Sequence, residues 1–477
     1  MTVYILGGGP TGMAVADGLK DIGIDNFVVL EARDQLGGLA QTLEWSGVGA
    51  HDLGPHKVFS LDEKITARVK GLLPPDEWLK RDKKSSIYLS GTYLPYPPSP
   101  FSLLGIFGIN TFVKMVVNYV LALLRNLLPK PDADSFESEL SGRVGEPLYR
   151  VLFKPIAQKL WADPKLLDAK LARGRVQTPS PIEMVIRMLG LSDKSKFEAL
   201  SFLYPKGGLQ KIWSAIARKV VDQDRCFKTN SRVIGLNLAG NRLTGIRYES
   251  GVSGKVVECE LGADDFVVST LPLNQLPGIF GSDFDEDIIS QIKANVRLND
   301  LKLVFFHLDQ EKLLAESWVF VPDSNIVFHR LSEQRAFDPE MTPSGTIVCC
   351  EVMEYEGKSK AYRDDVELIE LCVSDLRKMG YQISAPLESR IIPLWKSYPV
   401  YIRGYEPALE SILEHLDGFD NFRTLGRQGA FNYIGTLDAM DIGYGWVDWF
   451  EKGLADTRHN ELWKCERQRT DHYPVLD

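Results

Sequence analysis

Cysteine is scarce in this sequence, and the six cysteines lack the spacing of a metal site or a redox pair. They are Cys226, Cys259, Cys349, Cys350, Cys372 and Cys465, with no C-x-x-C among them. The adjacent pair should point to opposite faces of one strand. We therefore expect buried free thiols, a reducing and cytoplasmic environment, and no bound metal.

The chain also lacks an excess of basic residues, since 55 lysines and arginines face 64 acidic residues, for a net charge of −9. This balance argues against nucleic acid as the main partner, although a local basic pocket could still bind an anionic substrate. Internal repeats and low-complexity segments are not visible, and we expect the opening residues to form a core strand rather than a signal peptide. With 477 residues, 44% of them hydrophobic, we expect two or three lobes.

One hydrophobic run, residues 101–128, is long, and Lys114 and Arg125 are its only charges. Its length would allow a membrane span. A lysine near the middle is costly in lipid, however. We expect a buried helical pair here, with peripheral attachment to a membrane as the alternative and a true span as the least favoured.

The stretch from Val3 to Glu31 has the pattern of strand, glycine turn, helix, strand and acid. Gly7 permits the tight turn, Gly9 lets the backbone approach a pyrophosphate, and Gly12 lets the helix pack close to the strand. The helix N-terminus offers free N–H groups to phosphate. Glu31, about twenty residues after the turn, can bind ribose hydroxyls. The pattern predicts dinucleotide binding.

The residues after Glu31 indicate which dinucleotide is bound. Arg33 and the pair Gly37-Gly38 suit a second loop that passes over the cofactor phosphates. This arrangement resembles the amine-oxidase-like FAD superfamily, in which the extension marks FAD rather than NAD. The resemblance implies FAD-binding roles for Gly7, Gly9, Pro10, Thr11, Gly12, Glu31, Ala32, Arg33, Gly38, Leu39, Gly54, His56, Val233, Thr270, Gly426, Arg427 and Tyr433.

Further landmarks occur in the order found in UDP-galactopyranose mutases, a branch of this superfamily. They are Gly54-Pro55-His56, Val144 to Tyr149, Lys159-Leu-Trp161, Tyr204 to Lys211, His329-Arg330, Tyr398-Pro399-Val400, and Gly426-Arg427 with Phe431-Asn-Tyr433. Each motif is loose, but the order covers nearly the whole chain. Two positions depart from the family pattern: Phe59 stands where a second histidine is expected, and Gly435 where an acid is expected.

The resemblance implies a set of roles for residues of the site. Arg175 and Arg330 would clamp a diphosphate, as planar guanidinium groups do well. Catalytic roles fall to His56, Arg175, Arg330, Tyr398 and Tyr433, and substrate contacts to Trp161, Arg175, Arg330 and Tyr398. In this family the reduced flavin attacks the anomeric carbon through N5 and displaces the nucleotide diphosphate. The sugar then recloses with the other ring size, without net redox.

The expected fold is α/β: a Rossmann-like, GR2-type FAD-binding domain with two insertions. We expect the FAD-binding domain at 1–75, 200–272 and 415–455, a mainly helical domain at 76–199, an antiparallel-sheet substrate domain at 273–414, and a C-terminal extension at 456–477. The expected partners are a nucleotide-sugar and NAD(P)H as reductant. The alternative functions are an FAD-dependent oxidase, dehydrogenase or desaturase of the protoporphyrinogen oxidase or phytoene desaturase type, and a flavin-binding protein without catalysis.

Overall fold

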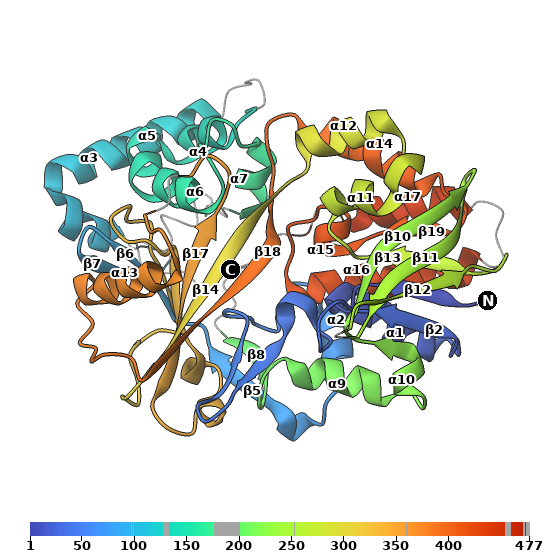
Figure 1. Cartoon of the computed structure of the whole chain (residues 1–477). Coiled ribbons are helices and arrows are strands. Elements are labelled where there is room, and N and C mark those ends of the chain that lie inside the picture. Colours follow the sequence, from blue (N-terminus) through green and yellow to red (C-terminus); the bar gives the residue numbers. More distant parts are fainter. Residues whose placement is uncertain are drawn as a thin grey trace.

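The chain opens with β1 (Val3–Leu6), the central strand of a five-stranded parallel sheet on the right of Figure 1. The computed structural model describes residues 1–96, 98, 100–126, 133–175, 201–251, 253–358, 361–453, 459–470 and 473. The sheet has the order β19-β13-β1-β2-β9, formed with β2 (Phe27–Leu30), β9 (Phe227–Lys228), β13 (Phe266–Ser269) and β19 (Phe422–Thr424). Strands β13 and β19 are buried along their whole length, as parallel strands covered on both faces should be.

Helices cover one face of this sheet. They are α1 (Pro10–Asp21), α9 (Gln210–Arg218) and α16 (Thr436–Gly453), with the shorter α2 (Glu63–Lys70), α10 (Gln223–Cys226) and α15 (Gly426–Gly429) nearby. Helices α1 and α16 approach each other closely at Gly443. A Cβ there would lie only 2.4 Å from the backbone oxygen of Thr11, so the contact requires glycine. This contact ties the end of the chain to the glycine turn at its beginning.

The other face of the parallel sheet packs on an antiparallel meander and three helices. The meander consists of β10 (Ser231–Ala239), β11 (Arg242–Ser250) and β12 (Lys255–Glu260), and the helices are α11 (Leu276–Phe280), α12 (Glu286–Asn295) and α14 (Tyr405–Asp417). Residues 273–296 and α14 therefore pack with the FAD-type unit rather than with the second sheet. The sheet domain, expected over 273–414, has its strands of this range between residues 297 and 400.

A seven-stranded sheet forms the other lobe (Figure 1), in the order β18-β14-β17-β16-β15-β6-β7. Its strands are β6 (Ser85–Leu89), β7 (Thr92–Pro95), β14 (Arg297–Leu308), β15 (Trp318–Phe320), β16 (Arg330–Glu333), β17 (Thr346–Glu354) and β18 (Glu388–Val400). Helix α13 (Asp365–Lys378) packs on one face with Cys350, while Cys349 belongs to the core on the opposite face. The prediction for the adjacent cysteines is confirmed.

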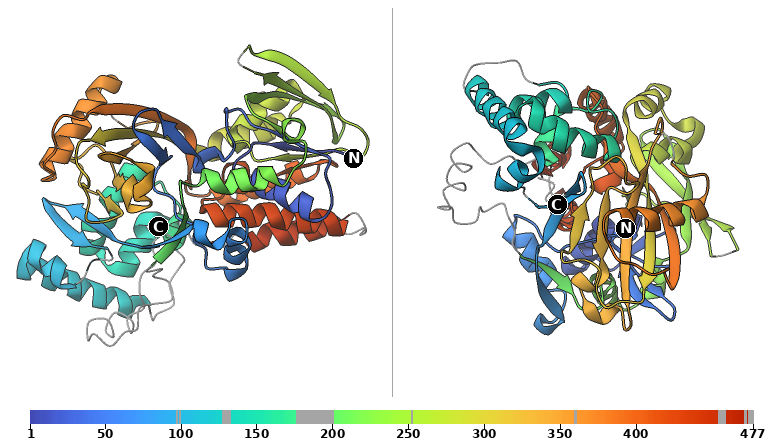
Figure 2. Two further views of the ribbon diagram at one scale, coloured as in Figure 1. Left: turned by 90° about the horizontal axis from the view of Figure 1, so that it is seen from below. Right: turned by 90° about the vertical axis from the view of Figure 1, so that its left-hand side faces the viewer.

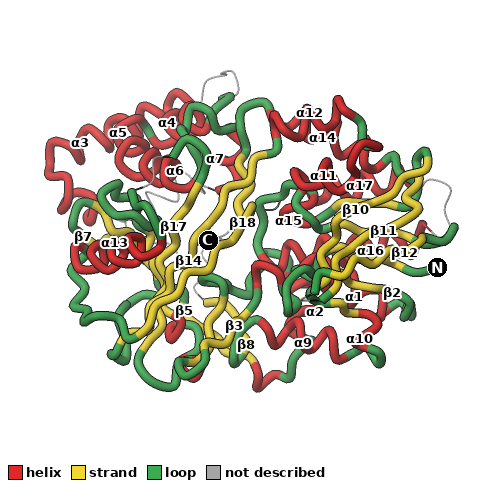
Figure 3. Tube along the Cα trace, in the orientation of Figure 1, coloured by secondary structure: helices red, strands yellow, loops and turns green. Residues whose placement is uncertain are grey.

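The helical unit contains α3 (Pro100–Asn126), α4 (Phe136–Val144), α5 (Glu146–Leu148), α6 (Lys154–Leu160) and α7 (Ala169–Arg175), and it lies beside the large sheet in Figures 2 and 3. The range 76–199 also holds strands: β5 (Trp78–Asp82) pairs with β8 (Ser201–Pro205), and β6 and β7 join the large sheet. The expectation of helix over 176–199 lies outside the described residues.

Two expectations for helical segments are wrong. Residues 101–128 were expected to form a buried helical pair. In the described part of this range, α3 is broken at Gly108 (φ +71°) and much of its apolar surface beyond that break is exposed. The C-terminal segment was expected to be a surface extension, but α17 (His459–Thr470) packs on α16, with Trp463 buried 5.1 Å from the ring of Trp449. Arg467 is buried as well and pairs with Glu410 of α14 at 2.9 Å, so an aromatic side chain and an ion pair together dock an otherwise polar helix.

Candidate functional site

A cavity of about 340 Å³ opens between the glycine turn of the parallel sheet and the near face of the seven-stranded sheet. Its lining comes from segments far apart in sequence. These are the turn after β1, the tip of β2, the loop 53–59, the end of α7, the exit of β13, strands β14, β16, β17 and β18, and residues 427–439. All three structural units therefore contribute side chains to one space.

The glycine turn has the geometry that the sequence predicts. Gly7 has a φ of +104°, and a Cβ there would lie 2.4 Å from Thr270 Oγ1. A Cβ on Gly12 would lie 2.1 Å from the backbone oxygen of Gly7, so only glycine lets α1 start this close to the strand. Gly9 lines the cavity, and a Cβ on Gly38 would come within 2.9 Å of its Cα. Two phosphate-type loops thus meet at Gly9 and Gly38.

The carboxylate of Glu31 lies at the tip of β2 beside this turn. Its Oε2 accepts a hydrogen bond from Gly8 N at 2.8 Å, and its Oε1 accepts one from Arg33 N at 2.8 Å. Burial raises the pKa of Glu31, while the amide hydrogen bonds partly oppose that shift. Both Glu31 and Arg33 line the cavity, in the place where an acid can contact a ribose.

Most of the residues predicted to bind FAD lie along the cavity wall. In addition to those above, the wall includes Pro10, Thr11, Leu39, Gly54, His56, Thr270, Arg427 and Tyr433. Gly12, Ala32, Val233 and Gly426 do not line it. Gly426 supports the site from behind, since a Cβ there would meet Thr11 Oγ1 at 2.6 Å, and Val233 packs in the core beneath the meander. Helix α1 starts at this wall without an acid in its first turn, so the residues present fit the phosphates and ribose of FAD.

Three arginines and two tyrosines form what we term the arginine–tyrosine cluster: Arg175, Arg330, Arg427, Tyr398 and Tyr433. The ring of Tyr433 lies between two guanidinium groups, 4.1 Å from that of Arg175 and 4.6 Å from that of Arg427, and Arg175 also donates to the Tyr433 hydroxyl at 2.7 Å. Tyr398 contacts Tyr433 edge to face at 5.5 Å. Burial raises the pKa of Tyr398, whereas Arg330, Arg427 and Arg175 each pull it down. The guanidinium of Arg427 lies 5.4 Å from the ring of Tyr398, and all five side chains line the same cavity.

Glu351 is a member of the site that the sequence did not reveal. It is 1% exposed and accepts two hydrogen bonds from Arg330, from Nε at 2.5 Å and from a terminal nitrogen at 2.9 Å. The two residues face each other across β16 and β17. The sequence feature that could have revealed it is a charged residue inside the apolar strand Ile-Val-Cys-Cys-Glu-Val-Met. This buried pair fixes the orientation of Arg330 within the cavity.

His56 lies in the wall next to these cations. Burial, Arg330 and Arg427 lower its pKa to about 4, although Nε2 lies 3.1 Å from the backbone oxygen of Leu53 and that contact opposes the shift. The imidazole is therefore neutral at neutral pH. It adds a polar, uncharged group to a wall whose cations are four arginines and Lys57.

Trp161 was predicted to contact substrate directly, but it lies behind the wall rather than in it. It is 4% exposed, its ring lies 5.6 Å from the guanidinium of Arg175 and 6.3 Å from Tyr433, and it packs on Phe136. Its Nε1 has no hydrogen-bond partner among the described residues. In this structure Trp161 supports Arg175 from behind.

The two positions that depart from the family pattern both lie in the cavity wall. Phe59 and Gly435 make the wall less polar there, but Asp438, in the first turn of α16, adds a carboxyl group that the sequence did not single out. Burial raises the pKa of Asp438 to about 6, and a hydrogen bond from Ser60 Oγ at 2.8 Å opposes that shift. A carboxyl group is therefore present in this part of the wall.

Trp395 is the most exposed aromatic residue of the wall, at 61%. It lies on a bulge of β18, where Lys396 has a φ of +54°. Asp300 Oδ1 accepts a hydrogen bond from Lys396 N at 2.7 Å, and Gln428 Nε2 donates to the Lys396 backbone oxygen at 2.7 Å. A left-handed non-glycine residue held from two sides stores strain, which is typical of functional positions.

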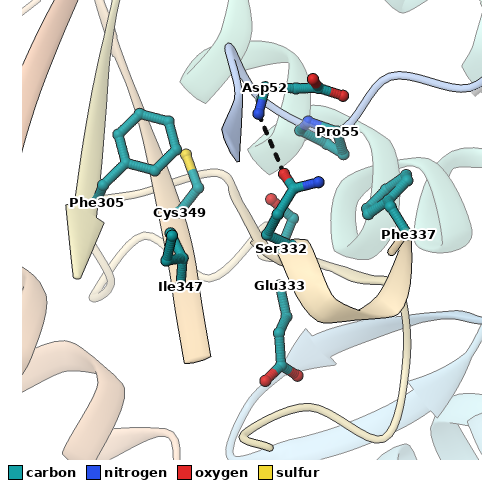
Figure 4. A pocket seen from close by; sticks show the side chains of 10 residues that line it. Asp52, Pro55, Phe305, Ser332, Glu333, Phe337, Ile347 and Cys349 are labelled. Atoms are coloured by element: carbon teal, nitrogen blue, oxygen red, sulfur yellow. Dashed lines mark hydrogen bonds between the residues drawn. The ribbon is translucent and has the colours of Figure 1, made fainter. Parts of the chain in front are cut away.

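Behind Gly54 and Pro55 there is a second, much smaller space of about 10 Å³ (Figure 4). Asp52 N donates to Gln334 Oε1 at 3.2 Å at its edge. The space is large enough for about one water molecule. The segment that carries His56 is therefore packed firmly from behind, and its open side is the large cavity.

Comparisons with known proteins agree with this geometry. The model of the family described as flavin containing amine oxidoreductase matches residues 10–417. Among curated proteins, the chloroplastic protoporphyrinogen oxidase 1 of Spinacia oleracea is 29% identical over 178 residues, which are 36% of this chain. The match spans 31% of that relative's length.

Solved structures match over almost the whole chain. A reduced UDP-galactopyranose mutase superposes with a TM-score of 0.82 at 20% identity and covers 99% of this chain and 98% of that one. A protoporphyrinogen oxidase-like protein from Exiguobacterium sp. 255-15 follows with a TM-score of 0.70 at 16% identity, covering 94% and 98%. A fatty acid isomerase from P. acnes gives 0.59 at 14% identity, covering 94% and 98%. At these identities the matches establish the fold.

Proposed function

Because the chain belongs to the family of flavin-containing amine oxidoreductases and is therefore an FAD-dependent enzyme, we propose that it acts on a nucleotide-linked sugar. The observation that carries this proposal is that Arg175, Arg330 and Arg427 line one cavity with Tyr398 and Tyr433 beside the FAD-binding turn. The similarity in fold to a reduced UDP-galactopyranose mutase supports it. The proposed reaction is an isomerisation of the sugar ring that requires reduced FAD.

The charge of the cavity suits a diphosphate. Its wall carries five cationic side chains, Arg33, Lys57, Arg175, Arg330 and Arg427, against three carboxyl groups, those of Glu31, Glu351 and Asp438. Glu31 lies at the ribose end of the glycine turn, and Glu351 is paired with Arg330. The part of the wall that carries Arg175 and Arg427 therefore supplies most of the positive charge that a diphosphate would meet.

Four of the five residues of the arginine–tyrosine cluster have a direct role in the proposed reaction. When bound, reduced FAD would supply the nucleophile for the anomeric carbon. Arg175 and Arg330 would hold the nucleotide diphosphate and stabilise the negative charge that it gains as it leaves. Tyr398 and Tyr433 would donate hydrogen bonds to the diphosphate, and neutral His56 would contact the cofactor without adding charge. Trp395 offers a flat apolar face at the edge of the cavity for a ring of the substrate.

A second candidate is an FAD-dependent oxidoreductase that acts on a more apolar substrate. The observation that favours it is the apolar part of the wall, formed by Leu53, Phe59, Leu301, Leu394 and Trp395. In that case the flavin would accept a hydride from the substrate, and the arginines would bind a carboxylate or phosphate at one end. This candidate requires net oxidation of the substrate, whereas the first does not.

Product analysis distinguishes the two candidates. The purified holoprotein is incubated with a panel of UDP- and other nucleotide-sugars in two forms, reduced with dithionite without oxygen and oxidised in air without dithionite, and the products are separated by chromatography. The proposed function predicts an isomer of unchanged mass and no consumption of oxygen in proportion to product. Oxidised product with stoichiometric oxygen uptake would favour the oxidoreductase, and absence of any converted nucleotide-sugar would remove the mutase proposal.

A further inference from the structure

Helix α3 presents a continuous apolar stripe on the surface. Its members are Ile109, Val113, Val116, Val117, Val120, Leu121 and Leu124, each between 41% and 62% exposed. They recur at intervals of three and four residues, so they lie on one side of the helix after the break at Gly108. Such a contiguous group of exposed aliphatic side chains is uncommon on a soluble surface and marks an interaction site.

The opposite side of α3 holds the helix firmly on the protein. Met115 and Ala122 are buried. A Cβ on Gly145 would lie 2.9 Å from the backbone carbon of Asn118, so α3 touches the junction of α4 and α5 directly. The stripe therefore belongs to a fixed element at the outer rim of the helical unit, on the far left of Figure 1 and at the edge of both views in Figure 2.

The charges on α3 are of one sign. Pro100–Asn126 contains Lys114 and Arg125 and no acidic residue, in a chain with 64 acidic residues and a net charge of −9. The two cations are separated by about three helical turns and so share one edge of the stripe. Aliphatic side chains bordered by basic residues match the boundary between acyl chains and anionic head groups.

We propose that α3 docks this protein onto an anionic lipid surface, with the helix axis parallel to the membrane plane. Ser102–Asn126 is long and apolar enough to cross a bilayer, but its packed side would have to leave the protein and Lys114 would have to enter the hydrocarbon core. An in-plane position buries the stripe and leaves the packed side intact. The inference does not depend on the substrate assigned to the cavity.

A second copy of the chain fits this stripe less well than lipid does. In paired helices, acidic and basic residues beside the apolar seam match each other across the interface. Here positions on both sides of the seam, such as Val116 and Leu121, are apolar, and the flanking charges are both positive. Two copies packed through α3 would bring like charges together without an acid on either helix to pair with them.

Co-sedimentation of the holoprotein with vesicles tests the proposal. Vesicles of phosphatidylcholine alone are compared with vesicles of phosphatidylcholine and phosphatidylglycerol. The wild type should bind the anionic vesicles more strongly. A variant carrying I109Q, V117Q and L124Q should bind about tenfold or more weakly, since three aliphatic side chains lose their burial in lipid. Glutamine favours helix, so α3 should persist, which the flavin absorbance and the thermal unfolding midpoint report.

The matched control carries V221Q, V256Q and V366Q, which remove three exposed valines elsewhere on the surface. It should bind like the wild type. The variant with K114Q and R125Q leaves the stripe intact and should lose its preference for anionic vesicles. A wild type that stays in solution with both vesicle types overturns the proposal, and so does equal loss of binding in the control. A concentration-dependent dimer that I109Q, V117Q and L124Q dissolve would assign the stripe to a second copy instead.

Discussion

At the scale of single residues, Arg175 carries most of the proposed recognition of the diphosphate. It stacks on Tyr433, lies next to Trp161 and reaches the cavity from the end of α7. Arg175→Ala should weaken binding of UDP to the reduced holoprotein by ~2 kcal/mol or more, about thirtyfold, because a charged hydrogen bond to phosphate is lost. Isothermal titration calorimetry measures the difference.

Arg173 provides the matched control for this prediction. It lies on the same helix but pairs with Glu139 at 3.2 Å and does not line the cavity. Arg173→Ala should change UDP affinity by no more than ~0.5 kcal/mol, as surface substitutions usually do. Equal losses in the two variants would mean that general charge, and not the position of Arg175, governs binding.

Glu351 allows a test of the buried ion pair. Removal of one partner from a buried pair leaves the other charge uncompensated, so Glu351→Ala should lower the free energy of unfolding by roughly 3–5 kcal/mol. Urea unfolding, monitored through the release of flavin, measures the effect. Glu406, which pairs with Lys170 on the surface at 2.6 Å, is the comparison. Glu406→Ala should cost at most ~1 kcal/mol. Similar midpoints for both variants would show that Arg330 does not depend on Glu351.

Membership of the candidate site could be predicted for residues in a local motif, but not for residues whose place depends on the pairing of distant strands. The sequence placed His56, Arg330, Tyr398 and Tyr433 in a candidate site, and the structure brings them to one cavity; their roles remain predictions. Glu351 was missed because its partner is set by the pairing of β16 with β17, which the sequence does not encode locally.

At the scale of elements, the turn from β1 into α1 fixes the cofactor site. A Cβ on Gly12 would collide with the backbone oxygen of Gly7 at 2.1 Å. Gly12→Ala should cost about 1–3 kcal/mol of stability through overpacking and should reduce the flavin content of the purified protein. The ratio of flavin to protein absorbance measures it.

Gly278 in α11 is the control for this substitution, because a Cβ there would meet nothing within 4 Å. Gly278→Ala should keep the full flavin content and stabilise its helix by roughly 0.5–1 kcal/mol. Full flavin content in the Gly12→Ala variant as well would show that close packing at this turn is dispensable.

The elements also show where periodicity is insufficient. The apolar spacing of α3 correctly predicted a helix, but the same spacing fits a buried helix and a surface helix with an apolar stripe. Only the packing of α4 and α5 on one side decides between them. For α17 the polar composition suggested an extension, but Trp463, Arg467 and Thr470 are buried, and they dock the helix on α16 and α14.

At the scale of the whole molecule, Lys159 joins the helical unit to the large sheet. Its Nζ donates to the backbone oxygens of Val321 at 2.8 Å and Phe328 at 2.9 Å. Burial, and then the nearby Lys358, lower the pKa of Lys159 to about 7. In the unfolded chain a lysine titrates near pH ~10.4, so between pH ~7 and ~10 the unfolded state binds more protons. Stability from this group therefore rises with pH in that window.

Comparison of wild type with Lys159→Met isolates this contribution. From pH ~7 to ~8.5 the free energy of unfolding of the wild type should rise relative to the variant by up to ~1.4 kcal/mol per pH unit. Thermal unfolding at several pH values measures the slope. Lys165→Met, at an exposed position, should run parallel to the wild type. If the free energy of unfolding had the same pH dependence in the wild type and in Lys159→Met, Lys159 would keep its proton in the folded state.

The overall architecture was predictable because consecutive signals agreed. The two strands on either side of the opening glycine turn and helix, β1 and β2, lie in one parallel sheet in the structure, and so does the apolar strand β13 that precedes Thr270. Boundaries were less predictable: β6 and β7 belong to the sheet of the other lobe because β6 pairs with β15, more than two hundred residues later. Pairings at such sequence separation follow from the assembled core and not from local preference.

The measurement that tests the central claim most directly is a titration of UDP-sugar against flavin fluorescence, in the oxidised and in the dithionite-reduced protein. If FAD at the glycine turn and a diphosphate at the arginine–tyrosine cluster share one cavity, the emission will change saturably, and the reduced protein will bind more tightly. Emission that stays constant in both redox states would contradict a shared cavity for flavin and nucleotide.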